Sequence, residues 1–164
     1  KAIGGGFPLS AVGARQDVMD ALSPGDHGST FGGNPVSCAA AVAGIDAMEA
    51  EALPQEARRL GEAALARLNH LSERLPELRV RGLGLMIGVE VVHRSTRSPL
   101  PEIAASIQRE ALREGVLLIT SGSDGNVVRV LPPLVITDAE LNHGIDVIER
   151  AALRATGSDP SSAA

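Results

Sequence analysis

The sequence has almost no aromatic side chains and a single cysteine. Phe7 and Phe31 are its only aromatic residues, and neither Trp nor Tyr occurs among the 164 residues. Proteins that bind single-stranded nucleic acid stack the bases on aromatic rings, so this scarcity argues against such a partner. One cysteine, Cys38, allows no intramolecular disulfide and no cysteine-based metal cage. Because Cys38 lies in an alanine-rich stretch, we interpret it as a small buried hydrophobic residue.

The sequence also lacks an excess of basic residues and any long apolar run. It has 15 Lys and Arg against 20 Asp and Glu, which gives a formal net charge of −5. A protein that binds the phosphate backbone of nucleic acid would show a basic stripe instead. No apolar run approaches the ~20 residues that cross a bilayer, and no signal peptide is visible. We therefore expect a cytoplasmic protein that contacts neither nucleic acid nor membrane.

What is present is an aliphatic composition arranged in two different parts. Residues 1–33 are dense in glycine and predict loops, with a possible strand at 9–12 and a possible short helix at 16–22. Asn34 is a good N-cap and Pro35 fits the first helical position, so a helix is predicted from there to about residue 51.

The second part alternates helices and strands. Helices are predicted at 55–75, at 102–114 and after the Thr137–Glu140 capping box, and strands at 79–81, 85–92, 116–119 and 126–131. The first of these helices carries an apolar stripe of Leu60, Ala64, Leu68, Leu71 and Leu75. This alternation predicts a small α/β sandwich in which helices cover a sheet.

Lys1–Leu9 is the first segment with candidate chemistry, because a lysine precedes a run of glycines. A neutral lysine amine can form an imine with a carbonyl cofactor, and glycines let the backbone approach a bulky group closely. Taken alone, the segment is more typical of a solvated loop lysine.

Two further segments could bind anions. In Gly28–Pro35, the hydroxyl of Thr30 precedes a predicted helix N-terminus, a position that suits phosphate; the alternative is an N-cap loop without a ligand. In Gly125–Pro133, Arg129 interrupts an apolar strand and should therefore face a carboxylate or a cavity. Arginine binds carboxylates bidentately, and the alternative here is a structural ion pair.

Together with Arg81–Glu90, these three segments resemble the class III pyridoxal-phosphate-dependent aminotransferases in order and spacing over residues 1–154. Within that class the resemblance is greatest to 4-aminobutyrate aminotransferases. It implies an α/β protein with the fold-type I transferase architecture. Because the sequence opens at the family's cofactor lysine, we expect a C-terminal fragment. Residues 1–50 would end the large cofactor-binding domain, residues 51–155 would form the small C-terminal α/β domain, and residues 156–164 would be a disordered tail.

The resemblance also implies roles for individual residues. Lys1 matches the lysine that binds pyridoxal 5′-phosphate covalently and then moves a proton to and from the substrate. Thr30 matches a hydroxyl that contacts the cofactor phosphate of the neighbouring subunit, which implies a homodimer with a shared active site. Arg129 matches the arginine that binds a substrate carboxylate. Gly82–Glu90 matches a structural strand to which we assign no chemistry, and no metal site is expected.

We therefore expect the full-length parent to be an aminotransferase that moves an amino group from an ω-amino acid, 4-aminobutyrate first, to 2-oxoglutarate. Acetylornithine or ornithine aminotransferase and glutamate-1-semialdehyde aminomutase share the scaffold and stay open. In the family, several cofactor-binding groups precede the lysine, so the isolated chain is expected to be inactive. An alternative of another class is a truncated remnant that serves only as a structural or interaction domain.

Overall fold

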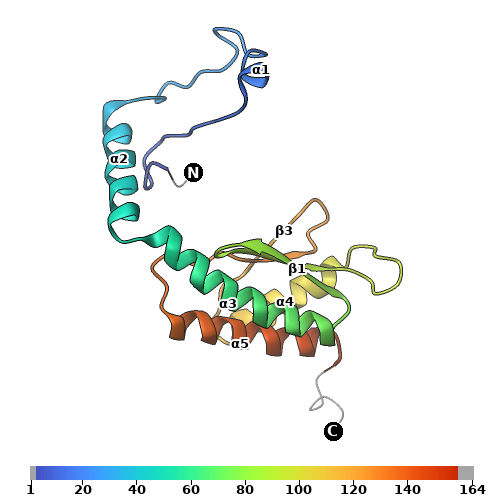
Figure 1. Cartoon of the computed structure of the whole chain (residues 1–164). Helices are drawn as coiled ribbons and strands as arrows, with labels where there is room; N and C mark the ends of the chain where they lie inside the picture. Colours follow the sequence, from blue (N-terminus) through green and yellow to red (C-terminus); the bar gives the residue numbers. More distant parts are fainter. Residues whose placement is uncertain (1–2, 159–164) are drawn as a thin grey trace. The chain divides into compact units, whose positions relative to one another are not determined.

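The computed structural model describes residues 3–158, which form two compact units divided between Ala52 and Leu53 (Figure 1). Lys1 and residues 159–164, most of the expected tail, lie outside the described residues. None of the helices between residues 3 and 158 has the length and apolar character that a membrane crossing requires.

The first unit is loop plus helix. It contains the short helix α1 (Gln16–Met19) and the longer α2 (Pro35–Ala50), and no strand occurs in its described part. The strand expected at 9–12 is therefore wrong: that segment is a loop, and none of the described strands pairs with it. Most apolar side chains of this unit are exposed, including Phe7, Val12, Val18, Leu22, Phe31, Val36, Val42 and Ile45.

The start of α2 follows the sequence prediction. Asn34 caps the helix by accepting a hydrogen bond from the Ser37 amide at 3.0 Å, and its own Nδ2 donates to the Ser37 hydroxyl at 2.8 Å. Ser37 and Ala41, one turn apart, are the buried residues of α2. Cys38 is exposed, which corrects our interpretation, because the helical register turns its neighbour Ser37 inward instead.

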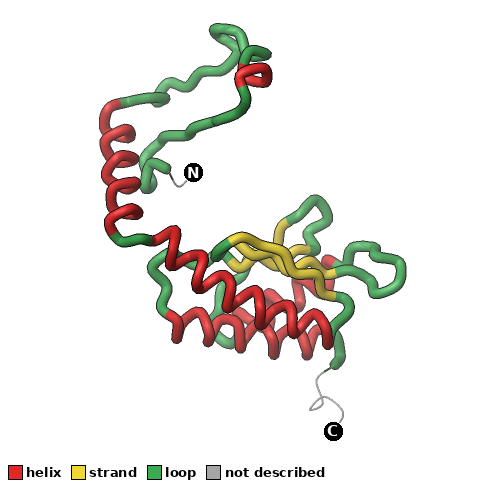
Figure 2. The backbone as a smooth tube through the Cα atoms, in the orientation of Figure 1, coloured by secondary structure: helices red, strands yellow, loops and turns green. Residues whose placement is uncertain are grey.

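The second unit is a four-stranded sheet covered by three helices on one face (Figure 2). Its elements are α3 (Leu53–Arg74), β1 (Leu78–Leu83), β2 (Met86–Val91), α4 (Pro101–Arg113), β3 (Ile119–Ser121), β4 (Val127–Val130) and α5 (Asp138–Ala155). The strands lie in the order β1-β2-β4-β3, and every neighbouring pair is antiparallel. The predicted small α/β sandwich is confirmed.

The core lies between the sheet and the helices. The predicted stripe on α3 is buried, with Leu68 at 0% exposure, and Ile145 and Ile148 of α5 are buried opposite it. Full burial of one such aliphatic side chain contributes about 1.5–3 kcal/mol, so an aliphatic core of this kind needs no aromatic residue. The predicted capping box of α5 is also present: the Glu140 amide donates to the Thr137 hydroxyl, and Glu140 accepts from the Thr137 amide.

Two local features determine where strands β3 and β4 begin. Gly115 ends α4 with a φ of +83°, and the amide of Val116 donates back to the carbonyl of Ala111. The third strand therefore begins at Ile119, later than predicted. Asn126 is buried at the start of β4, where its Nδ2 donates to the carbonyl of Val91 at 3.0 Å.

Candidate functional site

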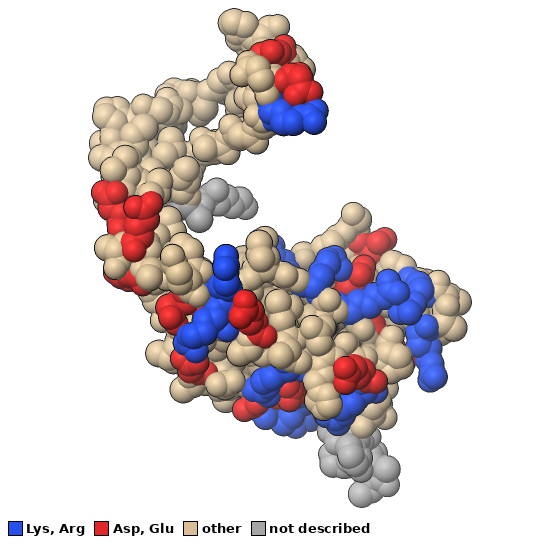
Figure 3. Space-filling model, viewed as in Figure 1, with Lys and Arg blue, Asp and Glu red and all other residues tan. Residues whose placement is uncertain are grey.

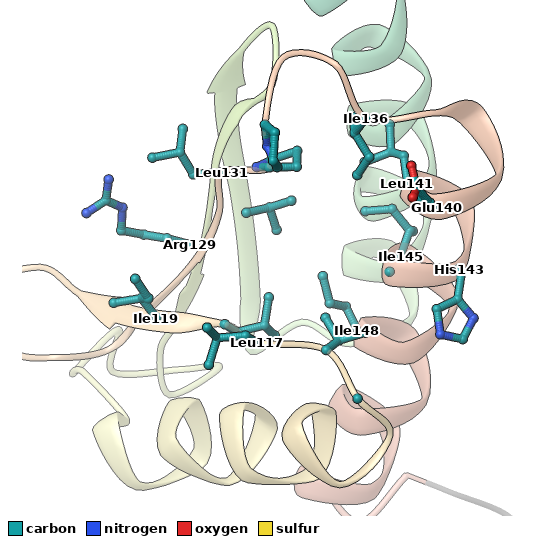
Figure 4. Close-up of a pocket in the computed structure, with 17 residues that line it drawn as sticks. Leu117, Ile119, Arg129, Leu131, Ile136, Glu140, Leu141, His143, Ile145 and Ile148 are labelled. Atoms are coloured by element: carbon teal, nitrogen blue, oxygen red, sulfur yellow. The ribbon is translucent and has the colours of Figure 1, made fainter. Parts of the chain in front are cut away.

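Arg129 lies on the face of the sheet that the helices leave open. Alternation along β4 turns Val128 and Val130 into the core, so the residue between them points the other way. Arg129 is exposed, and Figure 4 shows its guanidinium directed away from Ile145 and Ile148 of α5. The cation of this apolar strand therefore stays solvated without a buried partner.

A cavity of about 390 Å³ opens beside Arg129, between the β3–β4 side of the sheet and α5 (Figure 4). Most of its lining is aliphatic and includes Ile119, Leu131, Ile136, Leu141, Ile145 and Ile148. Glu140 and His143 also line it, but the carboxylate of Glu140 is engaged at the start of α5. There the hydrogen bond from the Thr137 amide lowers the Glu140 pKa below its ordinary value. Arg129 is one of the lining residues, but its guanidinium points away from the interior of this cavity (Figure 4).

The Arg129 guanidinium has no hydrogen bond or ion pair with any of the residues 3–158. Its neighbours across the ladder are Gly88 on β2 and Ile119 on β3. Gly88 has no side chain that could pack on the stem of Arg129, although Cγ1 of Val127 lies 3.2 Å from where its β carbon would be. An exposed guanidinium without an ion partner, such as that of Arg129, can bind a carboxylate through two parallel hydrogen bonds.

One carboxylate does lie on the same face. Glu90 of β2 accepts a hydrogen bond at 2.9 Å from Nη1 of Arg81 on β1. The sequence interpretation missed this pair, because it assigned no chemistry to Gly82–Glu90. The signal was nevertheless available, because alternation along each strand places every second residue on one face.

Thr30 lies in the first unit, in a turn ahead of α2, whereas Arg129 belongs to the second unit. The turn is closed by a hydrogen bond from the Gly32 amide to the Ser29 carbonyl at 3.1 Å. Thr30 is exposed, and its hydroxyl has no partner within the described chain. A free hydroxyl just ahead of a helix of 16 residues suits an anionic ligand. Lys1, the third predicted site residue, lies outside the described residues.

Other ion pairs lie elsewhere, on the surfaces of the helices. Hydrogen bonds from Arg150 lower the pKa of Glu114, and those from Arg59 lower the pKa of Asp138. These pairs tie α5 to α4 and to α3, so their role is structural. In the view of Figure 3, basic and acidic side chains are interspersed over the second unit.

Comparison with known proteins decides the family. The model of the family described as "Aminotransferase class-III" matches residues 1–152. The chain belongs to the class III aminotransferase family. The resemblance drawn from the ordered segments is thereby confirmed.

Relatives within this aminotransferase family carry several substrate names. The chain is 40% identical over 150 residues to a 5-aminovalerate aminotransferase of Pseudomonas putida, covering 91% of this chain and 35% of that protein. It is 42% identical over 153 residues to a 4-aminobutyrate aminotransferase of Mycobacterium leprae, covering 92% and 34%. It is 43% identical over 149 residues to an acetylornithine aminotransferase of Methanothermobacter thermautotrophicus, covering 90% and 35%. The chain thus spans about a third of the length of these class III relatives.

Solved transaminase structures share the fold. An amine transaminase from an uncultivated Pseudomonas species, in its pyridoxal-phosphate-bound form, matches 79% of this chain and 30% of its own chain with a TM-score of 0.69 and 38% identity. The α/β transaminase fold that the sequence predicted for this class III member is therefore confirmed.

Proposed function

We propose that the full-length protein containing this chain is a pyridoxal-phosphate-dependent transaminase that moves an amino group from an ω-amino acid to 2-oxoglutarate. The observation that supports this most is its 40–42% identity, over more than nine-tenths of the chain, to relatives named for 5-aminovalerate and 4-aminobutyrate. Both substrates carry a carboxylate at one end and an amine at the other. Arg129 offers an exposed guanidinium with no partner among the described residues, which fits such substrates.

The residues present fit the cofactor. The Thr30 hydroxyl is free and exposed ahead of the N-terminus of α2, an environment that suits a phosphate group. Lys1 supplies the amine for covalent attachment. When bound, pyridoxal phosphate draws electrons from the substrate carbon next to nitrogen and makes its C–H bond acidic. Once the substrate amine has displaced it from the cofactor, the free ε-amine of Lys1 would accept that proton and return it, as a general base and acid.

Arg129 would orient the substrate. By binding the carboxylate in a bidentate manner, it fixes which end of the amino acid approaches the reacting centre. Positioning of this kind lowers the barrier because the reacting groups no longer have to find each other by diffusion. Changing Arg129 should therefore affect substrates with a carboxylate more than it affects cofactor binding.

Thr30 would act across a subunit boundary. In this proposal its hydroxyl contacts the cofactor phosphate of the neighbouring subunit, so the functional unit is a homodimer with two shared active sites. The exposed apolar side chains of the first unit, among them Phe7 and Phe31, are available for such an interface.

The amino donor is the most specific part of the proposal. We place 4-aminobutyrate first, because relatives with that name recur in several bacteria at 39–42% identity. Acetylornithine is the second candidate, because a relative with that name is 43% identical over 149 residues. Ornithine and glutamate 1-semialdehyde are further donors to include in a test.

The deciding experiment uses the full-length protein with pyridoxal phosphate. Glutamate formation from 2-oxoglutarate is measured with each of the candidate donors. We expect the highest kcat/KM with 4-aminobutyrate, and Lys1→Ala should remove both turnover and the absorbance of the covalently bound cofactor. An unchanged spectrum in Lys1→Ala would contradict the role of Lys1, whereas preference for acetylornithine would change only the substrate.

A further inference from the structure

Four charged side chains share the open face of the sheet. The register places Arg81, Gly88 and Arg129 in one row across β1, β2 and β4. Arg79 and Glu90 lie opposite each other in the adjacent row. Within the four described strands Glu90 is the only acidic residue. Three arginines therefore surround a single carboxylate.

Glu90 is within reach of arginines on both neighbouring strands. It is diagonal to Arg81 on one side and diagonal to Arg129 on the other, because Gly88 is the direct ladder partner of both. Diagonal neighbours in a sheet lie about 7–8 Å apart, a span that Glu and Arg side chains bridge together. Gly88 places no side chain between Glu90 and Arg129. The nearest group there is Cγ1 of Val127, the residue opposite Glu90 on β4, which lies 3.2 Å from the place that a β carbon of Gly88 would take.

The structure shows which of these pairs forms. Glu90 Oε2 lies 2.9 Å from Arg81 Nη1, while Arg129 has no ion partner among residues 3–158. The Glu90 side chain is only 30% exposed, so the pair is less solvated than an ordinary surface pair. The carboxylate is thus turned towards the outer strand β1 and away from β4.

We propose that Arg81 is a positioning residue that holds Glu90 and thereby keeps Arg129 available for the substrate carboxylate. The inference rests on the proposed function, in which Arg129 binds that carboxylate. Without Arg81, Glu90 would be left with Arg79 directly opposite it on β1 and Arg129 diagonal to it on β4. The fraction of Glu90 that turns to Arg129 would compete with the substrate as an internal carboxylate. The identity of residue 81 would then set the apparent affinity for carboxylate substrates without touching them.

The test uses the full-length enzyme with 4-aminobutyrate and 2-oxoglutarate. Arg81→Gln should raise KM for both substrates about two- to fivefold, the range that a cross-strand charge pair supports, with kcat unchanged. A primary amine without a carboxylate should be used equally well by the variant and the wild type. The double variant Arg81→Gln with Glu90→Gln should return KM to the wild-type value, because the competitor has lost its charge.

Arg79→Gln is the matched control. It removes the same charge from the same strand and face, yet Arg79 makes no ion pair with Glu90 in the described structure. Its KM should equal that of the wild type. If KM rises equally in Arg79→Gln, the effect comes from the overall positive charge of this face, and the role of Arg81 is overturned. The role of Arg81 is also overturned if Glu90→Gln does not reverse the rise in KM caused by Arg81→Gln.

A second measurement does not depend on how the variants fold. In a crystal structure of the unsubstituted, substrate-free enzyme, Glu90 should contact Arg81; contact with Arg129 instead overturns the proposal. Failure of the proposed function would look different, because the wild type would then show no transamination or no dependence on Arg129.

Discussion

Gly61 of α3 lies directly against Gly84, and the space between them leaves no room for a β carbon. Gly84 is in the turn between β1 and β2 and has a φ of +54°. Helix and hairpin therefore approach each other backbone to backbone. Since β2 pairs with β4, this contact helps to fix the sheet that carries Arg129.

Gly61→Ala should destabilise the second unit by about 1–3 kcal/mol, because the added methyl group would collide with the Gly84 backbone. Gly144→Ala in α5 is the matched control, since a β carbon there meets nothing within 4 Å. The control should be neutral or stabilising by about 0.5–1 kcal/mol, because alanine favours a helix over glycine. Urea denaturation followed by circular dichroism measures both, and equal midpoints would contradict the close contact.

Thr137→Ala should destabilise α5 by about 0.5–2 kcal/mol, since it removes the hydroxyl that accepts from the Glu140 amide. Thr137→Ser keeps this oxygen and should retain most of the stability. The free energy of unfolding of the two variants gives the comparison. A loss of the same size in both would assign the effect to the methyl group of threonine and not to the cap.

Acid should weaken the helical layer. The pKa of Glu114 is lowered by hydrogen bonds from Arg150, and that of Asp138 by those from Arg59. Carboxylates with a lowered pKa stabilise the fold fully above their unfolded-state values, roughly pH 4, and lose that contribution as the pH falls further. Stability measured in urea should therefore be flat from pH 7 to about pH 5 and fall below it. Arg150→Gln should flatten this fall, and high salt should reduce it because the pairs are exposed.

Substitution of Arg129 should separate carboxylate recognition from cofactor binding. Arg129→Gln loses charge-assisted hydrogen bonds, so kcat/KM for 4-aminobutyrate in the full-length enzyme should fall about 10- to 100-fold. The cofactor absorbance should stay unchanged. Arg129→Lys keeps the charge but loses the planar guanidinium, so its kcat/KM should lie between those of the wild type and Arg129→Gln. Equal loss with an amine that has no carboxylate would show that Arg129 acts on the fold and not on the substrate.

The isolated chain should lack transaminase activity and should exchange its first unit readily. Among the described residues of that unit, helix α2 buries only Ser37 and Ala41, while nine large apolar side chains of the unit are exposed. Native-state hydrogen exchange should show fast exchange in α2 and slow exchange in α3 and α5, where the core lies. Turnover by the isolated chain, or equal protection of α2 and α3, would contradict this prediction.

Much of the second unit was predictable because its local signals agree with its packing. The stripe from Leu60 to Leu75 predicted the buried face of α3, and the Thr137–Glu140 pattern predicted the start of α5. Both signals depend on residues close in sequence, so no knowledge of the rest of the chain was needed.

The errors arose where distant contacts decide. Residues 9–12 have strand-like composition but no described strand pairs with them, and Cys38 looked apolar although the register of α2 turns Ser37 inward. The Arg81–Glu90 pair follows from the ladder between β1 and β2, which local composition does not specify. The roles of Lys1 and Thr30 came from resemblance alone and stay predictions.

Asn126 fixes which residues of β4 face the core and which face the open side of the sheet. Its buried amide and its backbone both bond to Val91, which locks the start of β4 against the end of β2. A slip of one position would push the Arg129 cation into the aliphatic interior and expel two valines into water. The hydrogen bonds of Asn126 therefore also determine that the Arg129 side chain lies on the open face of the sheet.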